Sequence, residues 1–138
     1  MILIDTGPII GLFDPLDPFH EKSVQVLQQI HEPLFSTLPV LTEAFHMLNP
    51  GSLGAENLRS FIINEGLFIW SMDETALFRS FDLMKRYADH PMDLADASLV
   101  AAAERLKVRR IFTIDRDDFE TYRIKIGHRY YPFEILTE

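Results

Sequence analysis

Two short apolar runs in this sequence each end in an aspartate. Residues 2–5 read ILID and residues 111–115 read IFTID, so Asp5 and Asp115 each follow a stretch that is typical of a buried strand. In open parallel sheets, ligands bind outside the carboxyl ends of the strands. The two aspartates therefore predict a ligand site at one sheet edge, although Asp5, in Asp-Thr-Gly-Pro, also suits a simple turn.

Two further carboxylates lie on predicted helices. Asp96 shares a helix face with Leu99 and Val100, and a carboxylate on an apolar face is costly unless it is paired or bound to a metal. The alternative role for Asp96 is stabilisation of the first helical turn. Glu43 lies at the border of the polar face of another helix, where the pattern alone favours an ordinary solvated glutamate.

Three more acids flank these positions. We expect Asp93 to be the N-cap of its helix first and a metal ligand second. Asp117 and Asp118 either begin a short turn that returns Phe119 to the core or extend the acidic site, and Asp118 is the better candidate of the two.

Carboxylates that converge at one sheet edge would carry metal chemistry. Clustered carboxylates repel one another and raise each other's pKa, so such a cluster is stable when hard cations such as Mg²⁺ or Mn²⁺ neutralise it. Two such ions about 4 Å apart can activate a water and stabilise the leaving oxygen in phosphodiester cleavage. The acids therefore indicate metal ligands.

The elements that must position these acids alternate between short apolar runs and amphipathic segments. The strand-like runs are residues 2–5, 34–36, 67–70, 110–114 and 130–136. Short apolar strands separated by helices predict an α/β fold, a mostly parallel sheet covered by helices on both faces. The length of 138 residues predicts a single domain, residues 1–138.

Five helices are expected between these runs, and cap residues mark where they begin. The first begins with Asp17 as N-cap and Pro18 at its first position, and the second runs from Thr37 to about Leu48. The third ends near Gly66. The fourth begins at a Ser71–Glu74 capping box and buries Leu77, Phe81, Met84 and Ala88, and the fifth begins near Asp93.

Composition limits the classes of protein. The chain has 47% hydrophobic and 25% charged residues, and it lacks cysteine, which excludes disulfides and thiolate metal sites. No apolar run approaches the roughly 20 residues of a membrane span, and MILID at the start does not resemble a secretory signal. We therefore expect a cytoplasmic protein with no membrane partner.

The net charge of −8 alone argues against a nucleic-acid partner. However, eight of the thirteen basic residues follow position 104. Setting aside Asp5, Glu43, Asp93, Asp96 and Asp115, which metals would offset, 16 acids remain against 13 bases, a balance of −3.

The motifs resemble those of PIN-domain nucleases, most closely the small VapC-type toxin branch. The likeness covers nearly the whole chain and follows the family's order: LIDTGPII, LTEAFHML, DLADASLVAAAERL and IFTIDRDDFETYR. It implies a three-layer α/β/α sandwich around a mostly parallel sheet of about five strands. It also implies a quartet that binds Mg²⁺ or Mn²⁺, namely Asp5, Glu43, Asp96 and Asp115, with Asp93 and Asp118 as outer members and Thr6 and Thr113 as hydroxyls that orient ligands or water.

The resemblance further implies an activity and partners. We expect a metal-dependent endoribonuclease that cuts single-stranded RNA or exposed loops, through in-line attack of water that leaves 5′-phosphate and 3′-hydroxyl ends. The family also implies a homodimer and an antitoxin protein. Arg116, next to Asp115, is the candidate contact to a substrate phosphate, and an ion pair with Asp117 or Asp118 is the alternative.

Three other interpretations remain open. If the resemblance to PIN domains holds, the chain could instead process RNA without an antitoxin, or it could serve only as a scaffold. A receiver-type signalling domain also gathers acids at strand ends, but LFIWS, the third strand-like run, ends without an acid.

Overall fold

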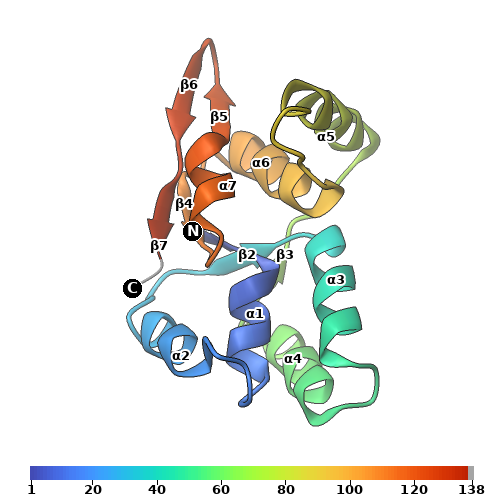
Figure 1. The fold of residues 1–138 in the computed structure, drawn as a ribbon, viewed down its shortest axis with the longest axis vertical. Helices are drawn as coiled ribbons and strands as arrows, with labels where there is room; N and C mark the ends of the chain where they lie inside the picture. Colours follow the sequence, from blue (N-terminus) through green and yellow to red (C-terminus); the bar gives the residue numbers. More distant parts are fainter. Residues whose placement is uncertain (137–138) are drawn as a thin grey trace.

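The computed structural model describes residues 1–136. Its main sheet has five parallel strands in the order β3-β2-β1-β4-β7 (Figure 1). The strands are β1 (Ile2–Ile4), β2 (Leu34–Ser36), β3 (Phe68–Ile69), β4 (Arg110–Phe112) and β7 (Glu134–Leu136). The predicted α/β fold with a parallel sheet of about five strands is therefore confirmed.

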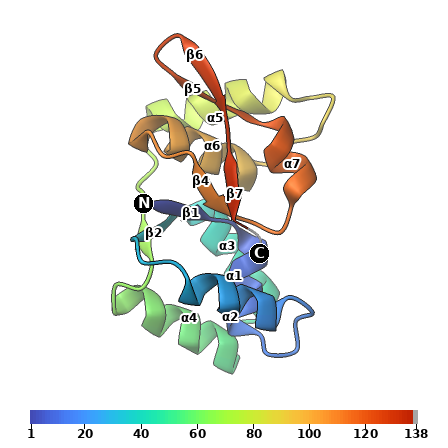
Figure 2. The same cartoon turned by 90° about the vertical axis from the view of Figure 1, so that its left-hand side faces the viewer.

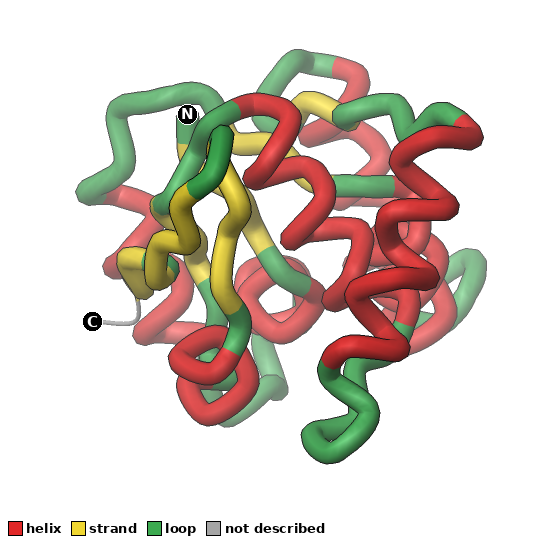
Figure 3. The backbone as a smooth tube through the Cα atoms, turned by 90° about the horizontal axis from the view of Figure 1, so that it is seen from above, coloured by secondary structure: helices red, strands yellow, loops and turns green. Residues whose placement is uncertain are grey.

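Helices cover both faces of this sheet. They are α1 (Thr6–Phe13), α2 (His20–Gln28), α3 (Leu38–Leu48), α4 (Leu53–Ile63), α5 (Glu74–Arg86), α6 (Leu94–Leu106) and α7 (Arg116–Thr121). Figures 1 and 2 show α1, α2 and α4 on one side of the sheet and α5 and α6 on the other, and α3 contacts both α1 and α6. Viewed from above, most of the helical segments lie to the right of the strands (Figure 3). None of the helices in residues 1–136 is long and apolar enough to cross a membrane.

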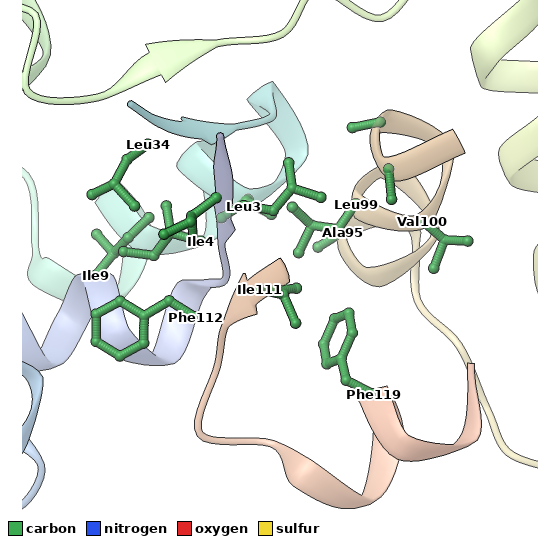
Figure 4. Packing of buried hydrophobic residues seen from close by; sticks show 14 of the residues in the cluster. Leu3, Ile4, Ile9, Leu34, Ala95, Leu99, Val100, Ile111, Phe112 and Phe119 are labelled. Atoms are coloured by element: carbon green, nitrogen blue, oxygen red, sulfur yellow. The ribbon is translucent and has the colours of Figure 1, made fainter. Parts of the chain in front are cut away.

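The core is built on the central strand β1, which is buried over its whole length. Because consecutive strand residues point to opposite faces, Leu3 points toward α6 while Ile4 points toward α1 (Figure 4). Helix α6 lies against its face of the sheet through small, fully buried side chains such as Ala97 and Ala102. Such small side chains let α6 approach the sheet closely.

The start of the chain differs from the sequence prediction. Asp5 does not simply open a turn. It is the N-cap of α1, a helix that the turn-like sequence Asp-Thr-Gly-Pro concealed. The prediction that the next helix begins at Pro18 is wrong, because Asp17 accepts a hydrogen bond from Phe19 N at 2.9 Å in a turn and α2 begins only at His20.

Helix α3 begins as predicted, with Thr37 as its N-cap. In α5 the cap is Asp73, whose carboxylate accepts from Ala76 N at 2.8 Å, so the predicted Ser71 cap is wrong. The buried face of α5 carries Ala76, Ser80 and Leu83 rather than the larger residues one position later. Since α5 packs on the alanine-rich α6, small residues face it. Of the four residues predicted to be buried, Leu77 and Met84 are partly buried, whereas Phe81 is exposed and Ala88 is exposed beyond the end of the helix, so these two were wrongly assigned.

The end of the chain contains a hairpin that was not predicted from the sequence. Strands β5 (Arg123–Ile126) and β6 (Arg129–Pro132) form a separate antiparallel pair. Gly127 has a φ of +65° in the two-residue turn between them, a conformation that favours glycine. The predicted single run over residues 130–136 is therefore divided between β6 and the edge strand β7.

Candidate active site

A pocket of about 330 Å³ opens at the carboxyl ends of β1 and β4. Six carboxylates line it, and they come from four parts of the chain: the end of β1, helix α3, the start of α6 and the start of α7. They are Asp5, Glu43, Asp93, Asp96, Asp115 and Asp118. The structure thus brings together all four residues of the predicted quartet and both predicted outer members.

Asp5 is held at the bottom of this pocket by the neighbouring strand. Its backbone N–H donates to Phe112 O at 3.0 Å, and its carboxylate accepts from Thr113 Oγ1 at 2.9 Å and from Thr6 N at 2.8 Å. The Thr113 hydroxyl in turn accepts from Asp115 N at 3.0 Å. Thr113 therefore lies behind the pocket and connects the two strand-end aspartates.

The hydroxyl of Thr6 is the other predicted hydroxyl group. Thr6 lines the pocket, and its Oγ1 is buried without a hydrogen-bond partner among the described residues. A buried hydroxyl that lacks a partner is unfavourable unless a water or a ligand satisfies it. Its position beside Asp5 therefore suits a ligand that brings oxygen atoms into the pocket.

Glu43 reaches the pocket because the start of α3 is fixed. Thr37, the N-cap of α3, forms a buried hydroxyl–hydroxyl hydrogen bond of 2.6 Å with Ser98 on α6. This contact holds α3 against α6, and Glu43 then lies partly buried one and a half turns along the helix. Glu43 also lines a second, adjoining groove together with Leu38 and His46.

The start of α6 supplies two acids with different roles. Asp93 caps the helix, since its carboxylate accepts from Asp96 N at 2.8 Å, as predicted. Asp96 is half-buried, and its Oδ2 accepts a hydrogen bond of 2.8 Å from the hydroxyl of Tyr122. Tyr122 was not predicted from the sequence. The residue follows α7, and no sequence pattern indicated its contact with α6.

The start of α7 supplies the last two acids. Asp115 caps α7 and accepts from Asp118 N at 3.3 Å. Asp118 is also hydrogen-bonded through Oδ1 to Nε2 of His90, whose ring meets the edge of the Tyr122 ring at a centroid distance of 6.1 Å. His90 thus borders the site, although the scattered histidines of the sequence gave no reason to select it.

Three of the acids in the pocket hold their protons more tightly than ordinary carboxylic acids do. Burial, followed by repulsion from Asp5, raises the pKa of Asp96 to about 8. Burial, with smaller contributions from Glu43 and Asp115, raises the pKa of Asp5 to about 6. Loss of hydration, followed by the hydrogen bond with Asp118, raises the pKa of Asp115 to about 6. The pocket therefore concentrates negative charge that it does not neutralise itself.

The donor groups fit a hard divalent cation in their chemistry. Across residues 1–136, no three acidic or histidine side chains converge closely enough to enclose a metal ion. However, the charged groups that line the pocket are all carboxylates, oxygen donors that Mg²⁺ and Mn²⁺ prefer, and their mutual repulsion would be relieved by a cation. The unsatisfied Thr6 hydroxyl agrees with such a ligand, because it can bond to the hydration shell that these ions retain.

Arg116, the predicted phosphate contact, lies outside this set. It is the first residue of α7, is exposed, and forms an ion pair of 3.2 Å with Glu120 one turn along the helix. It is not among the residues that line the acidic pocket. A role in substrate binding stays a prediction.

Comparisons with known proteins agree with this fold. The PIN domain family model matches residues 2–125. Ribonuclease VapC26 of Mycobacterium tuberculosis (strain ATCC 25618 / H37Rv) is 22% identical over 132 residues, which cover 94% of this chain and 97% of the relative. The crystal structure of M. tuberculosis VapC20, described as a sarcin-ricin loop cleaving toxin, has a TM-score of 0.80 at 14% identity and covers 94% of this chain and 99% of that one. A toxin-antitoxin complex from Klebsiella pneumoniae contains a chain with a TM-score of 0.67 at 20% identity, covering 88% of this chain and 92% of that one.

Proposed function

Since the chain belongs to the PIN domain family, we propose that it is a metal-dependent endoribonuclease that hydrolyses phosphodiester bonds in RNA. The observation that carries this proposal is the single pocket that six carboxylates line from four parts of the chain. The relative VapC26, which is a ribonuclease and matches nearly full length, supports the same activity.

The acids divide by position into ligands and supporting groups. Asp5, Glu43, Asp96 and Asp115 would hold Mg²⁺ or Mn²⁺, with Asp93 and Asp118 as outer members. When bound, the cations supply positive charge that activates water and stabilises the charge that develops during phosphodiester cleavage. Without them the pocket would repel a phosphate, so we expect the activity to depend strictly on a divalent cation.

The residues around the acids keep them in position. Thr113 and Thr6 N fix the two oxygens of Asp5, and Tyr122 fixes one oxygen of Asp96. A carboxylate whose orientation is fixed in advance loses less freedom when it binds a ligand, which is the usual role of such neighbours around metal ligands.

The biological role that we propose is that of the toxin in a toxin–antitoxin pair. The support is the likeness of the fold to VapC20, described as a toxin, and to a chain of a toxin-antitoxin complex. An antitoxin protein is then the expected partner. A homodimer and a cytoplasmic location stay predictions.

The test of the activity is cleavage of a labelled RNA by the purified chain with Mn²⁺, with Mg²⁺ and with EDTA. Asp5→Asn and Asp96→Asn each remove a charge without changing the side-chain volume, so we expect either to abolish cleavage while the fold is kept. Asp82→Asn, an exposed acid on α5 outside the pocket, is the matched control and should cut like the parent. Full activity in EDTA would contradict the proposal.

A further inference from the structure

The hairpin of β5 and β6 differs in charge from the rest of the molecule. Residues 122–133 contain Arg123, Lys125 and Arg129 and no acidic residue, in a chain with a net charge of −8. His128 lies in the turn. Figures 1 and 2 show that the hairpin, which we call the basic ribbon (residues 123–132), projects at the end of the molecule opposite to α2 and α4.

One face of the basic ribbon anchors it and the other is open. Ile124 is fully buried and is paired with Tyr131 across the hairpin, so these two residues share the inner face. Lys125 is paired with Tyr130, and both are exposed. Arg129 is paired with Ile126 at the tip of the ribbon and is exposed there. Glu104 accepts from the backbone N–H of Lys125 at 2.9 Å but forms its ion pair with Arg79, and within residues 1–136 neither the Lys125 ammonium nor the Arg129 guanidinium lies in an ion pair.

Arginines stack on both tyrosines of the basic ribbon. The guanidinium carbon of Arg86 lies 4.7 Å from the centre of the Tyr130 ring, and Arg86 also donates to the Tyr130 hydroxyl at 3.1 Å. Arg109 lies 4.5 Å from the centre of the Tyr131 ring. Planar groups that alternate with positive charge are the features that bind single-stranded nucleic acid, because bases stack on the planes while phosphates meet the charges.

The position of the basic ribbon suits a substrate that occupies the acidic pocket. Asp115 and Asp118 lie at the start of α7, and the ribbon begins directly after α7 ends. Six helical residues advance about 9 Å, so an RNA strand would need only a short path from the pocket to the ribbon. The pocket is acidic, and most of the affinity for RNA must therefore come from surfaces outside it.

We propose that the basic ribbon is an RNA-binding arm that holds a single-stranded segment of the substrate next to the acidic pocket. Lys125 and Arg129 contact phosphates, and the Arg86–Tyr130 pair offers a plane on which a base stacks. The inference rests on the proposed ribonuclease function and names the surface that the substrate uses. An acidic protein segment would meet the same charges but would not need the aromatic planes, which is why RNA is the favoured partner.

The test is binding of a fluorescein-labelled single-stranded oligoribonucleotide, followed by anisotropy in EDTA so that no metal-dependent cleavage occurs. The variant Lys125→Gln/Arg129→Gln is compared with Lys22→Gln/Arg59→Gln, which removes the same charge from α2 and α4 at the other end of the molecule. We expect the ribbon variant to bind about tenfold more weakly and the control less than about twofold. Since each lost phosphate contact reduces the salt dependence by about 0.7, the slope of log K against log salt should fall by about 1.4.

Tyr130→Leu separates stacking from charge. It should weaken binding about fivefold or more without a change in the salt slope, because base stacking carries no counterion release. All these side chains are exposed, so thermal unfolding should show that the variants keep the fold.

Two results would overturn the proposal. One is equal binding by the ribbon variant and its control. The other is a polyglutamate peptide that competes as well as the RNA while Tyr130→Leu binds normally, which would assign the ribbon to an acidic protein partner. Cleavage of RNA by the parent chain in Mn²⁺ is measured separately. If the parent cleaves RNA and the ribbon variant binds RNA as tightly as its control, only the arm is rejected. If the ribbon variant loses RNA binding but the parent does not cleave RNA, only the nuclease is rejected.

Discussion

The hydroxyl of Tyr122 donates a 2.8 Å hydrogen bond to Oδ2 of Asp96. The tyrosine is fully buried, so this bond fixes one oxygen of a half-buried carboxylate from within the core. Burial and the hydrogen bond to Asp96 also raise the pKa of Tyr122, so the group stays a proton donor at neutral pH. A neutral donor can orient the carboxylate without competing for its charge.

Tyr122→Phe should therefore weaken metal binding more than it weakens the fold. Groups that orient metal ligands commonly contribute about 10- to 100-fold in affinity, while the phenyl ring keeps the packing. We expect the Kd for Mn²⁺, measured by calorimetry, to rise at least about tenfold. Tyr87→Phe is the matched control, since its hydroxyl accepts from Arg123 N and, among residues 1–136, forms no hydrogen bond with an acid of the pocket. An unchanged Kd would show that Tyr122 serves only the core.

Thr113→Val should damage both the fold and the site. The valine removes the donor to Asp5 and the acceptor for Asp115 N, both of which are then left without that partner. We expect a loss of about 1–3 kcal/mol in the free energy of unfolding by urea, together with a loss of cleavage. Thr113→Ser keeps the hydroxyl and should restore most of both quantities. Equal stability of the valine and serine variants would contradict this account.

Stability in the absence of metal should fall as the pH rises. The folded-state pKa values of Asp5 (about 6) and Asp96 (about 8) lie above their ordinary values. At a pH between the ordinary and the folded-state pKa of each group, the folded chain therefore binds more protons than the unfolded chain. The resulting stabilisation is complete below the unfolded pKa and is lost as the pH rises through 6 to 8. In EDTA we expect Tm to decrease over this range, and saturating Mn²⁺ should remove the decrease. A Tm that rises from pH 6 to 8 in EDTA would contradict this assignment.

Asp96→Asn should stabilise the metal-free protein while it abolishes cleavage. The amide removes a buried negative charge that Asp5 and Asp93 repel, and its oxygen can still accept from Tyr122. We expect a gain of about 1–3 kcal/mol at pH 8, much less than the full pKa shift implies, because the site can relax and admit water. Urea unfolding in EDTA measures it. A destabilised variant would mean that the charge itself holds the pocket together.

The strand-end aspartates could be predicted because a short apolar run indicates a buried strand, and ligands bind at the carboxyl ends of parallel strands. Asp96 could be predicted because a carboxylate on an apolar helix face is costly unless it is paired or bound to a metal. Glu43 could not, since its position on a helix border is ordinary and only the resemblance to a family singled it out. These four side chains now line one pocket, while their catalytic roles stay predictions.

Tyr122, His90 and the buried face of α5 could not be predicted, for one shared reason. Each depends on which elements meet in space rather than on local pattern. Tyr122 is 26 positions from Asp96 in the sequence, and His90 is 28 positions from Asp118. Each pair comes into contact only because the starts of α6 and α7 are neighbours across the pocket. The α5 face was misassigned because the alanines of α6 accept small neighbours, which hydrophobicity alone does not indicate.

The hydroxyl of Thr113 joins acids that are 110 positions apart, and the central strand β1 takes one of its two neighbours from β4. During synthesis on the ribosome, Asp5 emerges early but has neither Thr113 nor Asp115 until more than 100 further residues have been made. A nascent or truncated chain therefore holds an incomplete set of acids. The cell that makes this protein meets the full set of pocket acids only after translation has passed Asp118.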